Sequence, residues 1–140
     1  MSKIAVVFWS GTGNTEAMAN AVVKGASDKG AEAVLLTPSE FGADAVDSYD
    51  AIAFGCPAMG AEELEDTEFE PMFSAVTPKL SGKKIALFGS YGWGDGEWMR
   101  TWEDSSREAG AVLAAESVIV QDAPDDDGIR QCEELGAALV

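Results

Sequence analysis

The stretch Phe8-Trp9-Ser10-Gly11-Thr12-Gly13-Asn14-Thr15 decides the fold, because an apolar run ends in it and a helical pattern begins directly after it. All residues from 10 to 15 are glycine or carry a short hydroxyl or amide group. A turn of this kind at the start of a helix presents backbone N–H groups and side-chain donors to an anion. The stretch therefore predicts an anion-binding turn between a strand and a helix, with a phosphate group as the expected anion.

The details of this turn exclude the two commonest phosphate-binding patterns. A P-loop needs a lysine before its last hydroxyl residue, where this chain has Asn14, and the dinucleotide fingerprint needs a third glycine, where it has Glu16. No Lys or Arg lies between Lys3 and Lys24, so a bound phosphate would be held by neutral donors and the helix dipole. A tight, well-capped turn with no ligand remains the alternative at this point.

Composition limits the kinds of partner that the protein can have. The chain of 140 residues has 25 acidic and 9 basic residues, which gives a net charge of −16. Nucleic acid and anionic membranes would be repelled by this charge, whereas a basic protein would be attracted. We therefore expect no nucleic-acid or membrane partner, and one domain spanning residues 1–140.

The residues that usually bind metals or act as general bases are nearly absent. The chain has no histidine, and its two cysteines, Cys56 and Cys132, fit no metal-binding spacing. The lack of histidine counts against hydrolase chemistry. Free thiols, no apolar run long enough to span a bilayer, and a start that does not resemble a signal peptide lead us to expect a cytoplasmic protein without a metal site.

Apolar and amphipathic segments alternate along the whole chain. Apolar runs predict strands at 4–9, 31–36, 50–56, 85–89 and 112–120, the last with its polarity broken at Glu116-Ser117. Helical spacing predicts helices at 16–29, 69–80, 98–109 and 129–139. This alternation indicates a three-layer, doubly wound α/β domain with a five-stranded parallel sheet. If the strand order is 2-1-3-4-5, ligands bind at the carboxyl ends of the strands around the first and third strands.

Three loops at that edge have unusual compositions: 10–15, 57–68 and 90–97. The second and third each present a large polarizable side chain beside glycine, Met59 and Trp93. If these side chains face each other across a crevice, they could hold a flat aromatic ring system between them. Taken singly, Met59 is explained equally well as an ordinary exposed methionine, and Trp93 equally well as an aromatic residue that anchors its loop.

Three motifs together identify a family resemblance: Trp9-Ser10-Gly11-Thr12-Gly13-Asn14-Thr15, Cys56-Pro57-Ala58-Met59-Gly60, and the segment from Leu87 to Gly94. They closely resemble the flavodoxins, specifically the short-chain type of anaerobic bacteria, and the resemblance covers essentially the whole chain. It implies a flavodoxin-like fold with a sheet in order 2-1-3-4-5 and one non-covalently bound flavin mononucleotide (FMN). It also implies a low-potential one-electron carrier that cycles between oxidised, semiquinone and hydroquinone states and shuttles electrons between redox enzymes.

The resemblance also assigns roles to individual residues. Residues 10–15 would hold the 5′-phosphate, Met59 and Trp93 would flank the isoalloxazine ring, and Glu62 would accept from its N3–H group. Ala61 stands where some relatives have Asp or Ser. The complete set of expected cofactor-binding residues is Trp9, Ser10, Gly11, Thr12, Gly13, Asn14, Thr15, Pro57, Ala58, Met59, Gly60, Ala61, Glu62, Ser90, Tyr91, Gly92, Trp93 and Gly94.

Two other functions, a small reductase and a receiver domain, fit the sequence less well than the electron carrier. A small FMN-dependent reductase of the quinone type would need a substrate cavity over the ring, which Met59 and Trp93 would block. A receiver domain would need an acidic pair at the end of the first strand, where this chain has Trp9-Ser10. In the carrier no side chain does acid–base or nucleophilic work.

The acidic residues after the second loop bear on how the carrier would meet its partners. They form a run with no basic residue, and as a solvated face they could steer a partner's basic patch to the flavin edge of a monomeric carrier. The run comprises Glu62, Glu63, Glu65, Asp66, Glu68 and Glu70.

Gly60 gives the first testable prediction. One-electron reduction protonates the flavin at N5, and rotation of the Gly60–Ala61 peptide could offer a carbonyl oxygen to that proton, because glycine tolerates positive φ. Replacing Gly60 by Thr should therefore lower the yield of the semiquinone in a redox titration. An unchanged yield would refute this role for Gly60.

Overall fold

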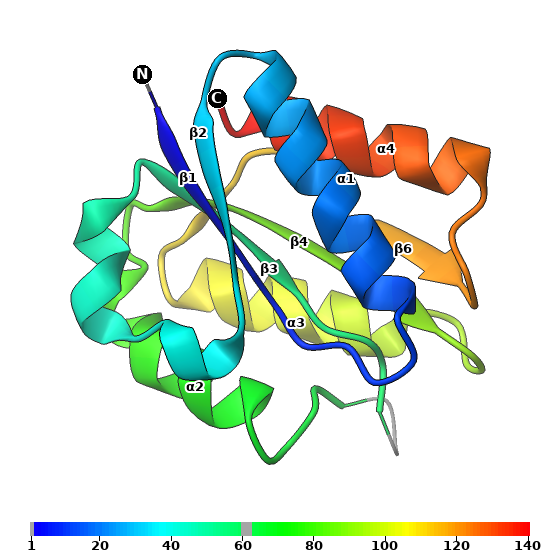
Figure 1. Ribbon diagram of the computed structural model, residues 1–140. Coiled ribbons are helices and arrows are strands. Elements are labelled where there is room, and N and C mark those ends of the chain that lie inside the picture. The colour runs from blue at the N-terminus through cyan, green and yellow to red at the C-terminus, as the bar shows by residue number, and fades with distance from the viewer. Residues whose placement is uncertain (1, 60–62) are drawn as a thin grey trace.

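A single parallel sheet forms the centre of the protein, with helices on both of its faces (Figure 1). The computed structural model describes residues 2–59 and 63–140. The strands are β1 (Lys3–Phe8), β2 (Glu32–Leu36), β3 (Ala51–Gly55), β4 (Lys84–Tyr91), β5 (Val112–Leu113) and β6 (Val118–Gln121). Their order, β2-β1-β3-β4-β5, with β6 also paired to β4, confirms the predicted 2-1-3-4-5 arrangement.

Within the described residues, four α-helices and three short 3-10 helices accompany the strands, and the last helix follows the final strand. The α-helices are α1 (Asn14–Asp28), α2 (Phe69–Val76), α3 (Glu97–Glu108) and α4 (Asp126–Ala138). The 3-10 helices are η1 (Pro38–Glu40), η2 (Ala43–Ser48) and η3 (Thr77–Lys79). In Figure 1 α1 and α4 lie side by side on one face of the sheet, and α2 and α3 lie on the other.

Alternating residues of the central strands supply two separate cores. Val7 of β1 and Leu87 of β4 pack with the aromatic side chains of α2 and α3, whereas Val6 and Phe88 pack against α1 and α4. Because β3 is covered on both faces, all of its residues are buried. This is why the central strands read as continuous apolar runs in the sequence.

The fifth strand was predicted over 112–120 with its polarity broken at Glu116-Ser117, and the structure has no continuous strand over this range. Two short strands, β5 and β6, take this place, and both pair with β4. Between them Glu116 is exposed, and the Ser117 hydroxyl donates to Glu103 Oε2 of α3 at 2.6 Å. These two polar residues interrupt the alternation that a continuous strand would need.

Helices α1 and α4 approach each other closely because each has a glycine at the contact. A Cβ atom on Gly25 would lie 1.8 Å from the Glu133 carbonyl oxygen, and one on Gly136 would lie 2.0 Å from the Val22 carbonyl oxygen. The contact therefore tolerates no side chain at either position. It fixes α1, and with it the turn that precedes α1, relative to the last helix.

Replacing Gly25 by Ala tests this packing. Helix propensity alone favours alanine by about 1 kcal/mol. We expect the opposite sign, a loss of about 3 kcal/mol in the free energy of unfolding, because the added methyl group collides with backbone. The control is Gly42→Ala, where the space around a Cβ is open and φ is −151°. Urea denaturation measures both variants, and a Gly25→Ala protein as stable as the Gly42→Ala protein would contradict the packing argument.

Candidate functional site

Three segments that are far apart in the sequence line one cleft at the carboxyl edge of the sheet. The cleft has a volume of about 340 Å³. Its walls come from the turn after β1, the segment after β3 and the end of β4, as the sequence predicted. The lining residues are Trp9, Gly11, Thr12, Asn14, Pro57, Ala58, Met59, Ser90, Tyr91, Gly92 and Asp122.

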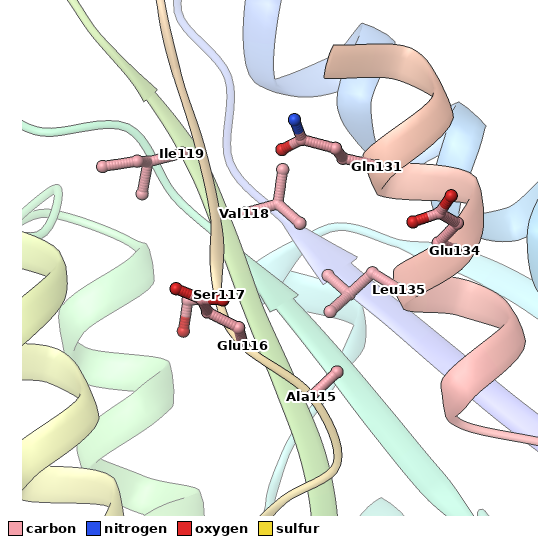
Figure 2. Close-up of a pocket in the computed structure, with 8 residues that line it drawn as sticks. All are labelled: Ala115, Glu116, Ser117, Val118, Ile119, Gln131, Glu134 and Leu135. Atoms are coloured by element: carbon pink, nitrogen blue, oxygen red, sulfur yellow. The ribbon is translucent and has the colours of Figure 1, made fainter. Parts of the chain in front are cut away.

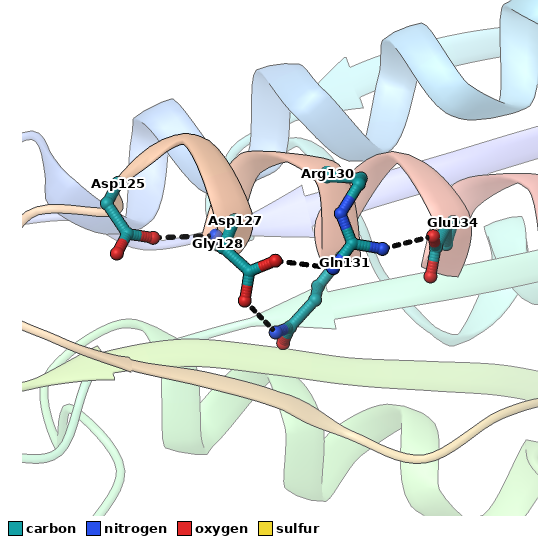
Figure 3. A network of polar contacts seen from close by, with 6 residues as sticks. All are labelled: Asp125, Asp127, Gly128, Arg130, Gln131 and Glu134. Carbon is teal, nitrogen blue, oxygen red and sulfur yellow. Dashed lines mark hydrogen bonds and ion pairs between the residues drawn. The ribbon is translucent and has the colours of Figure 1, made fainter.

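The turn after β1 leaves the start of α1 without a side-chain cap. Gly13 is the N-cap residue, with φ of 94°, and no side chain in the described part of the chain caps the helix. The Ser10 hydroxyl instead accepts from Gly13 N–H at 3.0 Å, which orders the turn. Helix α4 differs, because the Asp125 carboxylate accepts from Gly128 N–H at 2.8 Å (Figure 3). The start of α1 is thus available to an external acceptor.

The first and third segments are joined by a buried hydrogen bond. Thr15 Oγ1 of α1 and Ser90 Oγ lie 3.0 Å apart. Ser90 and Tyr91 were predicted to lie in a loop, and this was wrong: they are the last residues of β4 and pair with Val120 and Gln121 of β6. The extra pairing partner at this edge, β6, extends β4 by two residues beyond the predicted end. As a result, Ser90 and Tyr91 are held by the sheet itself.

The second segment makes backbone hydrogen bonds both to the sheet and within itself. Ala58 N–H donates to the Ser90 carbonyl at 3.0 Å, and Met59 and Glu63 exchange two backbone hydrogen bonds of 2.8 and 2.9 Å. Gly60, Ala61 and Glu62, including the proposed peptide rotation and the N3–H acceptor, lie outside the described residues. Met59 lines the cleft and is 37% exposed.

Trp93 is not among the described residues that line this cleft. Trp93 is 62% exposed, and no other large hydrophobic residue among those that the structure describes is exposed to this extent. It lies in the segment 92–96, where Gly94 and Gly96 have φ of 86° and 91°. Stacking of Trp93 on a ring therefore stays a prediction.

Asp122 lines the cleft and was missed by the sequence analysis. It is the only residue other than glycine with positive φ, 59°, in the described part of the chain. Its N–H group donates to the Tyr91 carbonyl at 2.8 Å, which continues the β4–β6 ladder by one residue. The rule used for the other loops could have found it, because Asp122 directly follows the last strand at the same edge.

Glu65 corrects the interpretation of the acidic run as a wholly solvated face. This side chain is 5% exposed. Its carboxylate accepts from the N–H groups of Thr67, Glu68 and Phe69 at 2.8 to 2.9 Å, and also from the Thr67 hydroxyl. Burial alone would raise the pKa of Glu65, but these hydrogen bonds outweigh it and lower the pKa below the ordinary value. Glu65 is thus an ionised cap for the start of α2.

A second hollow, of about 500 Å³, lies between the 115–119 segment and α4 (Figure 2). Three of its polar side chains have partners within the protein: Gln131 donates to Asp127, Glu134 accepts from Arg130 (Figure 3), and Ser117 donates to Glu103. Unlike the first cleft, it takes nothing from the three predicted loops. The carboxyl-edge cleft is therefore the better candidate for a ligand site.

The cysteines and acidic residues give no sign of metal chemistry in the described chain. Residues 2–59 and 63–140 contain no group of three metal-ligating side chains. Burial raises the pKa of both Cys56 and Cys132 to about 12, so these thiols are unreactive at neutral pH. Within the same residues no helix is long and apolar enough to cross a membrane.

An open parallel sheet with a cleft at the carboxyl ends of its strands, beside the start of the first helix, places the chain among the doubly wound α/β proteins, a class that binds ligands at the switch point of the strand order. The chain matches the family described as flavodoxin over residues 6–136. It is 47% identical to the flavodoxin of Megasphaera elsdenii and 45% identical to that of Clostridium beijerinckii, each over 96% of both chains. The solution structure of two-electron reduced Megasphaera elsdenii flavodoxin matches with a TM-score of 0.89 and covers 97% of each chain. The chain belongs to the flavodoxin family.

Membership settles the general activity. The protein is an FMN-containing, low-potential electron carrier, and it transfers electrons to redox partner proteins. It is an electron-transfer protein, as the sequence predicted. The flavin supplies the redox chemistry when bound, and the protein binds it and sets its environment.

The lowered pKa of Glu65 predicts how stability depends on pH. A carboxyl group with a folded pKa below its unfolded value stabilises the protein above the unfolded pKa, and this stabilisation is lost as pH falls through the folded pKa. Glu65→Gln should therefore reduce the free energy of unfolding by about 2 kcal/mol near neutral pH, the usual loss for hydrogen bonds to a charged group. The difference from the wild type should shrink below the ordinary carboxyl pKa of 4.5. Urea denaturation at several pH values measures it, and a difference independent of pH would contradict the ionised cap.

Proposed function

We propose that FMN binds in the carboxyl-edge cleft, with its phosphate at the turn of residues 10–15 and its ring between the 57–62 and 90–94 segments. The observation that carries this proposal is the convergence of all three segments on one cleft of about 340 Å³. The residues that would hold the cofactor are those predicted from the sequence, with Asp122 added.

The chemistry of the turn supports the assignment of the phosphate. The uncapped start of α1 offers backbone N–H groups, and Ser10, Thr12 and Asn14 add neutral donors beside it. A Cβ on Gly11 would lie 3.1 Å from the Trp9 ring, so a side chain there would crowd the turn. These features fit a phosphate held without a cation.

The electrostatics of the cleft favour a low potential. The described lining residues include the carboxyl group of Asp122 and no Lys or Arg. With a net charge of −16, the protein disfavours a further negative charge on the cofactor. Each exposed carboxylate contributes little by itself because solvent and salt screen it.

The same net charge supports our proposals on the redox partners and on the oligomeric state. We propose that redox partners dock through a basic patch, attracted by exposed carboxylates near the cleft such as Glu63 and Asp66. Copies of the chain repel one another at −16, which favours a monomer, and the free thiols of Cys56 and Cys132 suit the cytoplasm. We also propose that residues 1–140 act as one domain.

Replacing Ser10 by Ala tests the phosphate assignment. The variant loses a hydroxyl of the turn and the hydrogen bond that orders Gly13. We expect FMN affinity to fall about tenfold while riboflavin, which lacks the phosphate, changes by less than about twofold. Flavin fluorescence during titration of the cofactor-free protein measures both.

The matched control is Ser27→Ala, because Ser27 is exposed and lies near the end of α1, far along the chain from the turn. Its affinity for both flavins should equal that of the wild type. A Ser10→Ala protein that loses FMN and riboflavin equally would contradict the phosphate assignment, and a wild type that fails to bind FMN would contradict the proposed function itself.

A further inference from the structure

The carboxylate of Glu65 holds the segment between β3 and α2 in place from inside. Glu65 Oε1 accepts from Glu68 N–H at 2.8 Å and from Phe69 N–H at 2.9 Å, and Oε2 accepts from Thr67 N–H at 2.9 Å. At the other side of Glu65, its own N–H donates to Cys56 Sγ at 3.3 Å. Glu65 therefore connects the end of β3 to the start of α2.

Glu68, whose backbone is fixed by Glu65, reaches across to the anion-binding turn. Its Oε2 accepts from the indole Nε1–H of Trp9 at 2.7 Å, a contact between residues 59 apart in the sequence. Trp9 also donates its backbone N–H to the Gly55 carbonyl at 3.0 Å. The Trp9 side chain is thus oriented by a residue from the other segment.

The Trp9 ring also limits the space available to the turn of residues 10–15. The position of a Cβ on Gly11 lies 3.1 and 3.3 Å from two atoms of this ring. Both Trp9 and Gly11 line the cleft. A rotation of the Trp9 ring would therefore change the space at the turn directly.

We propose that Glu65 is a positioning residue that, through Glu68 and Trp9, couples the 57–59 and 63–69 segments to the turn of residues 10–15. This inference rests on the proposed binding of FMN in the cleft. Because the two segments would hold opposite ends of the cofactor, their relative placement decides whether phosphate and ring are bound at the same time. The coupling makes Glu65 a determinant of cofactor affinity, although it does not line the cleft.

The single variants are Glu65→Gln and the control Glu70→Gln. Both remove one negative charge from the same stretch, but Glu70 is exposed and its carboxylate accepts from Ser74 on its own helix. We expect Glu65→Gln to weaken FMN binding at least about tenfold and Glu70→Gln to change it less than about twofold. Equal effects of the two variants on FMN affinity would overturn the proposal, because charge alone would then explain both.

A double-mutant cycle tests the coupling to Trp9. Trp9→Phe keeps an aromatic ring and removes the N–H donor to Glu68. If Glu65 acts through Glu68 and Trp9, the loss of FMN affinity in Glu65→Gln/Trp9→Phe should be clearly smaller than the sum of the single losses. The control pair Glu70→Gln/Trp9→Phe should be additive. Additive losses in both pairs would overturn the proposed route.

The midpoint potential of bound FMN gives a readout that overall stability does not move. Glu65→Gln should shift the one-electron potential by an amount different from that of Glu70→Gln, because only the first variant changes the placement of the 57–59 segment. The same shift in both would count against the proposal.

If Glu65→Gln does not fold, Trp9→Phe and Glu68→Met, which removes the side-chain acceptor, replace it in the cycle. Each breaks the same Nε1–H···Oε2 contact, so the double variant should lose no more affinity than the stronger single variant. Full additivity would overturn the coupling. Failure of the wild type to bind FMN would instead contradict the proposed function on which the inference rests.

Discussion

The unsatisfied N–H groups at the start of α1 are the constraint on which the site depends. A helix start must find acceptors for these groups, from its own N-cap side chain, from solvent or from a ligand. Helix α4 uses the Asp125 carboxylate for this purpose, whereas α1 begins at Gly13 without a side-chain cap. A negative N-cap residue in place of Gly13 would occupy the donors that an anion needs. The turn thus lacks the stabilisation of a side-chain cap and leaves the N–H groups of the first helical turn open to an external acceptor.

The rest of the fold holds this helix start in one place. The close contact of α1 with α4 through Gly25 and Gly136 fixes the helix axis, and the buried Thr15–Ser90 hydrogen bond fixes its first turn against β4. Because the sheet order brings β1, β3 and β4 together, the three segments that follow these strands meet at one edge. Rigid elements therefore supply the placement, and short loops supply the donors.

The sequence predicted what is set by local pattern and by the general rules of parallel sheets. The apolar run of β3 is continuous because the strand is covered on both faces, and the helix predicted at 16–29 ends just before Gly30, which has φ of 91°. The end of β4 could not be predicted, because Ser90 and Tyr91 become strand residues only through pairing with β6, which is remote in the sequence. Tertiary pairing overrode the local turn signal of Ser90.

The burial of Glu65 and the place of Asp122 in the cleft also depend on contacts between segments of the folded chain. Glu65 looks like any other member of an acidic run, and its burial follows from the fold of residues 65–69 around its carboxylate, which no spacing reveals. Asp122 could have been found from its place directly after the last strand, whereas its hydrogen bond to the Tyr91 carbonyl depends on the pairing of β6 with β4, which is remote in the sequence. Trp93 shows the reverse case: a distinctive residue was easy to notice, but its exposure could not be inferred from its neighbours.

The net charge of −16 bears on the two ends of the cofactor in different ways. At the ring end, surrounding negative charge opposes the addition of electrons and so agrees with the low potential of this carrier. At the phosphate end the same charge would oppose binding, and no cation in the turn offsets it. In the proposed binding mode neutral dipoles solve this problem, since they act at hydrogen-bond distance, where they outweigh distant carboxylates that solvent and salt screen. Long-range charge can then set the potential and the choice of partner, while short-range donors set cofactor affinity, so the two can vary independently.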